Sequence, residues 1–249
     1  MKSELLDMVM RFFLMLGLCM QVACTTSILQ ESSETYPDKT ELDGIWVGSF
    51  DIRGRGPYDF FAIHVGDKST AVSHRAKAVC VGQVQQDGSY YYSKYNLYVL
   101  DGSPFDYARL TGEISEGKIT SHFKTLNGGD TGRLEITYSD MYERPSSLEL
   151  LEGVWGYTDP DGLSYEITIT GGVIQGEDSS GCNYMGNVSL INPRYNAYKV
   201  QINISGCATV NGDYEGLSYL DEHESTYLRI DVVSEDYGFH YDWKKQSVI

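Results

Sequence analysis

The chain has few basic residues. It contains 19 Lys and Arg against 35 Asp and Glu, which gives a formal net charge of −16 at pH 7. Such a surface repels nucleic-acid phosphates and anionic lipid headgroups. We therefore expect no nucleic-acid partner. A basic protein, a cation or a neutral envelope glycan would meet no such barrier.

Signatures of catalysis and metal binding are also missing. Neither HExxH nor GxSxG occurs, and the turns Asn127–Asp130 and Asp159–Gly162 supply only fragments of a calcium loop. We expect no enzymatic activity, no cofactor and no metal site, although a metal site assembled across distant strands stays open. None of the five histidines repeats a metal-ligand spacing: His64, His74, His122, His223 and His240.

Long apolar runs are scarce. The run Phe12–Met20 follows Arg11 near the start of the chain. It is too short to span a bilayer as a mature helix but has the length of a secretory signal core. Glu4 and Asp7 lie where a signal peptide carries only positive charge, so the true start stays open between three residues: Met1, Met8 and Met10.

The end of this run, Val22-Ala23-Cys24, resembles the lipobox of bacterial lipoproteins, although Gln21 stands where that motif prefers Leu. The resemblance implies that Cys24 is the first mature residue and is acylated as a membrane anchor. Thr25 replaces the Asp that marks inner-membrane retention, which favours the outer membrane. The alternative is a soluble exported protein, and the face of the membrane is not indicated.

Only five cysteines are present, and Cys19 lies in the predicted signal. Cys182 and Cys207 share the context Ser-Gly-Cys, and we predict that they form a disulfide in an oxidising compartment. Cys80 lies in the alternating segment KAVCVGQV and is expected to face a core as a small apolar residue.

Helical periodicity is absent from the mature chain. Segments such as YDFFAIHV, LSYEITIT and TYLRIDVV alternate with period two and are rich in Tyr, Ile, Val and Thr. Turn formers separate them at intervals of roughly 8 to 12 residues, which is typical of antiparallel sandwiches and barrels. A closed barrel is favoured because closure removes exposed strand edges.

The sequence repeats itself. LDGIWVGSF from Leu42 aligns with LEGVWGYTD from Leu151, and Tyr-Asn-x-Tyr occurs from Tyr95 and again from Tyr195. A segment with the Pro and Ser content of a connector separates the copies. We predict a duplicated fold with this organisation: signal peptide 1–23, flexible tether 24–40, β-barrel 41–140, linker 141–150 and β-barrel 151–249.

Each copy begins with Gly-x-Trp: Gly44 with Trp46, and Gly153 with Trp155. This pattern resembles the calycin group, in which it plugs one end of an eight-stranded up-and-down barrel. The resemblance implies that fold for both copies. The stretch from Tyr142 to Leu220, with SSGCNYMG, NPRYNAYKV and a second SGC, resembles an uncharacterised class of proteobacterial lipoproteins that carries no assigned activity.

Tyrosine is abundant, with 20 residues. In SYYYSKYNLY, alternation places Tyr90 and Tyr92 on one face of a strand and Tyr91 on the other. At least one ring then points outward, which makes Tyr90, Tyr91 and Tyr92 a candidate binding surface. The alternative is that these rings only pair across strands.

Three classes of function fit these features. The first is a non-enzymatic envelope lipoprotein whose β domains bind a protein or an envelope polymer, including as an inhibitor of a basic enzyme such as lysozyme. The second is a small-ligand carrier of the lipocalin type. It is disfavoured because the inward side chains of a barrel of about 100 residues tend to fill its interior, and it would need an open apolar lumen of several hundred Å³. The third, a hydrolase, would need a histidine with a shifted pKa beside a carboxylate between the domains.

Overall fold

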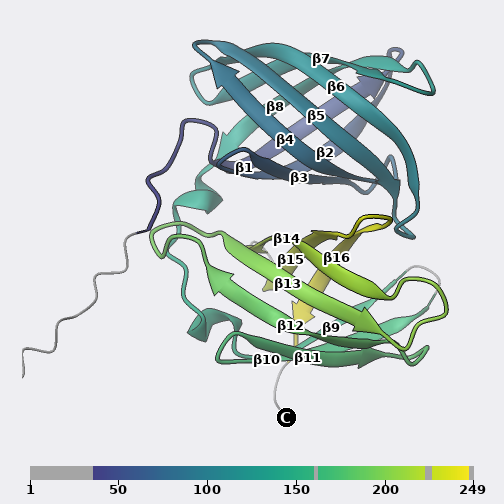
Figure 1. The fold of residues 1–249 in the computed structure, drawn as a ribbon. Coiled ribbons are helices and arrows are strands. Elements are labelled where there is room, and N and C mark those ends of the chain that lie inside the picture. Colours follow the sequence, from purple (N-terminus) through teal and green to yellow (C-terminus); the bar gives the residue numbers. More distant parts are fainter. Residues whose placement is uncertain (1–35, 160–161, 222–225, 247–249) are drawn as a thin grey trace, which may run out of the picture. The chain divides into compact units, whose positions relative to one another are not determined.

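A computed structural model describes residues 36–159, 162–221 and 226–246. It contains two closed β-barrels of antiparallel strands that follow one another in sequence order (Figure 1). The prediction of two tandem eight-stranded up-and-down barrels is confirmed. The predicted signal peptide, Cys24 and most of the predicted tether lie outside the described residues. Within them, no helix is long and apolar enough to cross a membrane.

Barrel 1 is the first barrel along the chain and is coloured purple to teal in Figure 1. Its first and last strands pair with each other, so the sheet has no free edge. Its strands are β1 Gly44–Ile52, β2 Arg55–Val65, β3 Lys68–Ser73, β4 Ala78–Asp87, β5 Tyr90–Val99, β6 Pro104–Ser115, β7 Lys118–Thr125 and β8 Thr131–Ser139.

Barrel 2 follows after two short 3-10 helices, η1 Asp140–Glu143 and η2 Glu149–Leu151. It closes through pairing of its first and last strands. Its strands are β9 Gly153–Thr158, β10 Ser164–Thr170, β11 Val173–Asp178, β12 Asn183–Leu190, β13 Tyr198–Ser205, β14 Gly212–Asp221, β15 Tyr227–Val233 and β16 Gly238–Lys245.

The period-two pattern of the sequence decides which side chains enter each lumen. In β13, with sequence YKVQINIS, buried and exposed residues alternate without interruption. Tyr198, Val200, Ile202 and Ile204 lie in the core cluster of barrel 2, and the residues between them face outward. The strand propensity and the alternation therefore point to the same structure.

Glycines let the strands coil tightly enough to close. A Cβ atom on Gly82 of β4 would lie 1.8 Å from the backbone oxygen of Lys94, and one on Gly216 of β14 would lie 1.8 Å from that of Asp231. No other residue can approach the neighbouring strand so closely. Each barrel thus bends at a glycine in the middle of a strand.

The Gly-x-Trp repeat has the same structure in both barrels. Trp46 and Trp155 are fully buried in the cores of their barrels. The indole nitrogen of Trp46 donates to the carbonyl oxygen of Leu42 at 3.0 Å, and that of Trp155 donates to the carbonyl oxygen of Leu151 at 2.8 Å. Gly44 begins β1, as Gly153 begins β9.

The second repeat, Tyr-Asn-x-Tyr, is not equivalent in the two barrels. The copy from Tyr95 lies in the second half of β5, whereas the copy from Tyr195 precedes β13 and ends on its first residue. Asn196 pins the backbone of Leu220, accepting from its nitrogen at 2.9 Å and donating to its oxygen at 2.7 Å. β5 and β13 are the fifth strands of their barrels, but the motif lies at opposite ends of them. The prediction that the two copies of this motif are equivalent was therefore wrong.

The two barrels pack against each other through their outer faces. Ile45 and Ile63 of barrel 1 share a buried cluster with Leu217 and Tyr219 of barrel 2. The segment between the barrels joins this cluster through Met141. Outward-facing apolar residues of both barrels are therefore buried, which stabilises their association.

The last part of the predicted tether is held in place. The Lys39 ammonium donates to the hydroxyl of Tyr138 at 2.8 Å and forms an ion pair with Glu143. The amide of Asn192 in barrel 2 donates to the carbonyl oxygen of Pro37 at 3.0 Å. Residues 37–40 thus contact both barrels.

Candidate functional site

Barrel 1 holds an apolar cavity of about 200 Å³. It lies in the half of the lumen where β1 ends and β2 begins, away from the buried indole of Trp46. A cavity of this size and character can take up a small apolar group, since comparable dry cavities bind benzene. Its walls include Phe50, Phe60, Cys80, Leu97, Phe123 and Leu134.

The other half of the same lumen is polar. The hydroxyl groups of Ser69 and Tyr95 hydrogen-bond at 2.7 Å. The imidazole of His64 and the hydroxyl of Ser121 are buried and make no well-aligned hydrogen bond with the described residues. Burial lowers the pKa of His64 to about 3, so the ring is neutral at physiological pH.

Cys80 lies in the wall of the cavity as a free thiol. Burial, with a smaller effect of the Asp231 charge, raises its pKa to about 12. The thiol is therefore protonated at neutral pH and contributes as a small apolar side chain, as the sequence predicted.

The lumen of barrel 2 is filled with aromatic rings. Tyr241 lies 5.5 Å from Trp243 and 5.8 Å from Tyr165, measured between ring centroids. Tyr157 packs 5.4 Å from Tyr165, and the hydroxyl of Tyr184 donates to Asp178 at 2.9 Å, which anchors the edge of this cluster. These rings occupy space that barrel 1 leaves open.

The predicted disulfide is present in barrel 2. The sulfur atoms of Cys182 and Cys207 are 2.07 Å apart. The bond joins the residue before β12 to the loop between β13 and β14. It therefore ties a loop to a neighbouring strand at one end of the barrel.

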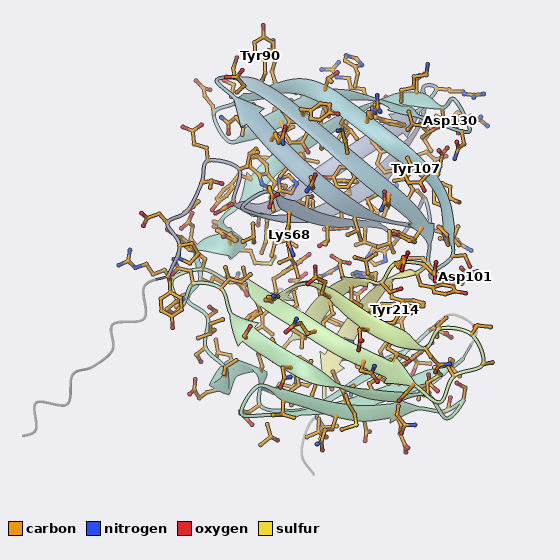
Figure 2. The ribbon with its side chains drawn as sticks, in the orientation of Figure 1. Lys68, Tyr90, Asp101, Tyr107, Asp130 and Tyr214 are labelled. Carbon is orange, nitrogen blue, oxygen red and sulfur yellow. A yellow bond between two sulfur atoms is a disulfide. The ribbon has the colours of Figure 1, made fainter. Side chains whose placement is uncertain are left out.

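The three tyrosines predicted to form a binding surface do not share one face of the strand. Tyr90 is 69% exposed and points away from the barrel (Figure 2), and Tyr92 is half-buried. Tyr91 is 1% exposed, because alternation turns it into the lumen, where it stacks on His64 at 6.3 Å. Tyr91 cannot contribute to an exposed binding surface, so its inclusion was a mistake that the predicted alternation already implied.

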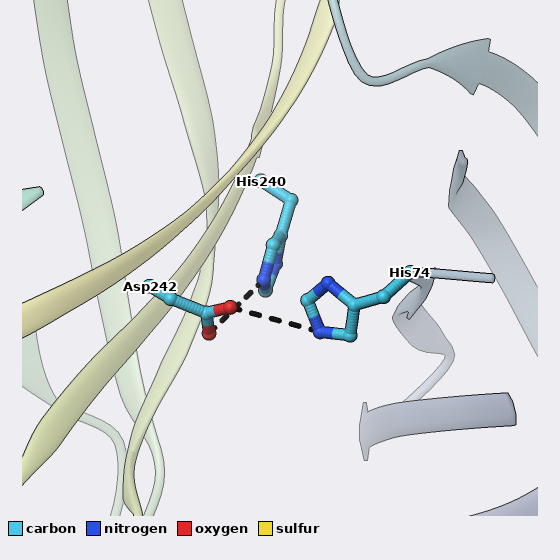
Figure 3. A group of neighbouring side chains, drawn as sticks. All are labelled: His74, His240 and Asp242. Carbon is cyan, nitrogen blue, oxygen red and sulfur yellow. Dashed lines mark ion pairs between the residues drawn. The ribbon is translucent and has the colours of Figure 1, made fainter. Parts of the chain in front are cut away.

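A charged cluster lies where the barrels meet. Figure 3 shows His74, from the turn after β3, facing His240 and Asp242 of β16. The Nε2 atom of His240 is 3.1 Å from Oδ1 of Asp242, and the Nε2 atom of His74 is 3.6 Å from Oδ2 of the same carboxylate. The ligand-type atoms of the three residues lie within 4.8 Å of one another.

A second carboxylate fixes the orientation of His240. Its Nδ1 atom is 2.7 Å from Oδ1 of Asp231, whose other oxygen accepts from the Thr70 hydroxyl of barrel 1 at 2.8 Å. Burial alone would lower the pKa of His240, but the Asp231 and Asp242 carboxylates outweigh it and raise the pKa to about 9. The imidazole is therefore protonated at neutral pH.

Arg229 completes the cluster. Its guanidinium lies 3.0 Å from Asp221, 3.2 Å from Asp242 and over the ring of Phe61 in barrel 1 at 5.2 Å. Burial would raise the pKa of Asp242, but His240 and Arg229 hold it well below its usual range. The pKa of His74 is lowered by burial and by the nearby His240 charge.

The cluster meets the two requirements that we set for a hydrolase, a histidine with a shifted pKa and a carboxylate within hydrogen-bonding distance. Among the described residues, no serine, threonine or cysteine side chain hydrogen-bonds to either imidazole. A protonated His240 cannot accept a proton as a general base.

The sequence did not predict that these residues lie together. His74 and His240 are separated by most of the chain, and only the packing of two barrels brings them together. A weak signal was available: β15 and β16 place Arg229, Asp231, His240 and Asp242 on one face, opposite an apolar face. The ordinary interpretation of such a face is contact with solvent.

Comparison with known proteins adds little. No protein-family model matches the chain, and no curated protein matches it. Among solved structures, one from Bacteroides fragilis, provisionally assigned as an outer membrane protein, is 10% identical and has a TM-score of 0.26, covering 82% of this chain and 96% of its own.

Proposed function

We propose that this protein is a non-enzymatic lipoprotein of the bacterial outer membrane and that barrel 1 binds the apolar part of a small ligand. The observation that carries the proposal is the difference between the two lumens. Barrel 1 keeps an apolar cavity of about 200 Å³, while aromatic rings fill barrel 2. This supports a small-ligand carrier, the alternative from the sequence, with a cavity smaller than the several hundred Å³ expected of a lipocalin-type lumen.

The lining of the cavity defines the chemistry of the ligand. Its walls are aliphatic and aromatic, and the Cys80 thiol is neutral. A cavity of this size accommodates roughly a benzene ring or a short alkyl chain. Phe105 is 50% exposed and also lines the cavity, so a larger ligand would place its apolar end inside and its remainder against this ring.

Binding can be tested with the fluorescent probe N-phenyl-1-naphthylamine, which brightens in apolar surroundings. We expect saturable binding that octanoate displaces. Ala108 lines the cavity and is buried, so Ala108→Phe would fill it and weaken probe binding at least tenfold. Ala208 is exposed in barrel 2, so Ala208→Phe makes the same change away from the cavity and should leave binding unaltered.

Absence of saturable binding to the unmodified protein would exclude the carrier function. Equal binding by the Ala108→Phe and unmodified proteins would place the probe elsewhere and contradict the assignment to barrel 1. Circular dichroism of both variants checks that the barrels remain folded.

The membrane anchor is a separate part of the proposal and rests on the lipobox-like Val22-Ala23-Cys24. Cys24→Ala should move the protein from the membrane fraction to the soluble fraction and abolish incorporation of labelled palmitate. A variant that stays in the membrane fraction would contradict acylation at Cys24. Probe binding by barrel 1 would be unaffected either way.

A second candidate, binding of a protein or envelope polymer, is supported by exposed aromatic rings. Among the described residues, the largely exposed rings belong to barrel 1: Tyr90, Phe105 and Tyr107. Aromatic side chains of this kind suit protein or sugar recognition. A pull-down from envelope extracts with the unmodified protein and with Tyr107→Ala tests it, since a specific partner should be lost from the variant.

A further inference from the structure

We propose that His74, His240 and Asp242 form a binding site for a divalent transition-metal ion, of which Zn²⁺ is the best match, and that this ion clamps the two barrels together. The site is distinct from the cavity of barrel 1 and independent of ligand binding there. It also goes against the expectation from sequence spacing, which included no metal site.

The three ligand atoms converge from two barrels. Asp242 Oδ2 faces His74, whereas Oδ1 faces His240 and Arg229 (Figure 3). Two imidazoles and one carboxylate are a ligand set that Zn²⁺ favours, with a water molecule in the fourth position. Because only barrel 1 supplies His74, the complete site requires both barrels.

The surroundings of His240 are those of a metal ligand. The residue is 8% exposed, and its Nε2 atom is buried, 3.1 Å from the Asp242 carboxylate but without a well-aligned hydrogen bond. Its Nδ1 atom is held by Asp231, which Thr70 holds in turn. Histidines that bind metals commonly use such a carboxylate on the opposite nitrogen, because it fixes the direction in which the free nitrogen points.

The charges around the site also suit a cation. The Arg229 guanidinium is shared between Asp221 at 3.0 Å and Asp242 at 3.2 Å. It therefore does not neutralise the three carboxylates Asp221, Asp231 and Asp242, and a cation bound by Asp242 would reduce the remaining negative charge.

The geometry requires only a small adjustment. Ligand atoms in a tetrahedral zinc site lie roughly 3.4 Å apart, closer than the 4.8 Å limit that encloses the three atoms here. The His74 side chain can rotate inward because it is 39% exposed. Its backbone stays in place because its N–H donates a hydrogen bond to Asp59. Asp242 also lines an open polar groove on barrel 2, through which an ion can enter.

The test is calorimetric titration of Zn²⁺ into the full chain, with Cys19 and Cys24 replaced by Ser so that their thiols do not compete. We expect one ion per chain with a Kd of micromolar or below. His74→Gln should weaken binding at least 100-fold and Asp231→Asn by roughly 10- to 100-fold. His122 is an exposed histidine on β7, so His122→Gln is the matched control and should bind normally.

Substitution with Co²⁺ supplies a readout that does not depend on variants. Bound to the unmodified protein, Co²⁺ should show the intense visible absorption of a four-coordinate ion. A Zn²⁺ Kd weaker than about 100 μM, or unchanged affinity in a folded His74→Gln protein, would overturn the proposal. A Co²⁺ spectrum indistinguishable from that of the hydrated ion would do the same.

Discussion

Barrel 1 and barrel 2 share a topology but use the lumen in opposite ways. When Trp46 and Trp155 are aligned, the next inward position is Gly48 in β1 and Tyr157 in β9. Gly48 contributes no side chain to the lumen, and a Cβ atom there would lie 2.1 Å from the backbone oxygen of Glu135. Tyr157 instead places a ring in the lumen, where it packs against Tyr165.

Both lumens also hold buried polar groups. In barrel 2, Asp178 accepts from Tyr184 and from the backbone and side chain of Ser180, so its buried oxygens are satisfied. Other buried groups make no well-aligned hydrogen bond to the described residues: His64 and Ser121 in barrel 1, and Ser218 and Trp243 in barrel 2. Each such group lowers the stability of its barrel.

The two barrels share the buried tryptophan and its hydrogen bond, whereas the rest of each lumen differs. Barrel 2 has the features of a stable support: a filled core and a disulfide. Barrel 1 has an apolar cavity that suits ligand binding. The following predictions test this division, from the largest expected effect to the smallest.

Removing one large ring should be costlier in barrel 2 than in barrel 1. Trp243→Ala empties a fully packed core and should lower the free energy of unfolding by about 3 to 5 kcal/mol. Phe123 already borders the cavity, so Phe123→Ala should cost about 2 kcal/mol or less. Chemical denaturation followed by peptide-resolved hydrogen exchange separates the two barrels, and equal losses would contradict the division.

The disulfide should stabilise barrel 2 selectively. It closes a separation of 25 residues, for which chain entropy predicts about 3 to 4 kcal/mol. In the Cys182→Ser/Cys207→Ser protein, hydrogen exchange should accelerate in β12 to β14 and stay unchanged in β4 to β6. Similar acceleration in both barrels would show instead that they unfold as one cooperative unit.

The sequence was sufficient to predict the fold because its signal is local. Alternation in segments such as YKVQINIS determines which side chains face inward, and turn residues determine where each strand ends. The Cys182–Cys207 disulfide was predicted from the shared Ser-Gly-Cys context and from the expectation of an oxidising compartment. The repeat that contains Trp46 and Trp155 has the same local structure in both barrels, because each indole donates to the carbonyl oxygen four residues earlier.

The candidate sites could not be predicted from the sequence, because they depend on the volumes of side chains in the lumen and on contacts between residues that are distant along the chain. The cavity depends on the summed volume of inward side chains from eight strands, which no single segment of the sequence reveals. The His74, His240 and Asp242 cluster depends on how two barrels pack, which no local pattern encodes. The Tyr-Asn-x-Tyr motif shows the opposite error, in which a local repeat suggests an equivalence that the structure lacks, since identical residues occupy non-equivalent positions.

Acid should destabilise barrel 1 through His64. Its pKa falls from 6.5 when unfolded to about 3 when folded, so below pH 6.5 the unfolded chain binds a proton that the folded barrel does not. Stability from this group is therefore complete above pH 6.5 and declines as the pH falls towards 3. Between pH 7.5 and 5 the loss should be about 2 kcal/mol.

His64→Gln provides the comparison for that measurement, because its amide does not titrate in this range. Denaturation at pH 7.5 and pH 5 should show a smaller difference for the variant than for the unmodified protein. An equal difference would mean that other groups cause the acid sensitivity.

The smallest expected effect concerns a single hydroxyl. Ser121 lies inside barrel 1, and its oxygen is buried with no hydrogen bond to the described residues. Ser121→Ala removes this unsatisfied group and should raise the free energy of unfolding by about 1 kcal/mol. Ser69 differs because its hydroxyl bonds to Tyr95, so Ser69→Ala should destabilise by about the same amount. If denaturation instead shows both changes to be destabilising, the Ser121 hydroxyl has a hydrogen-bond partner in solution, and the polar half of this lumen is fully satisfied.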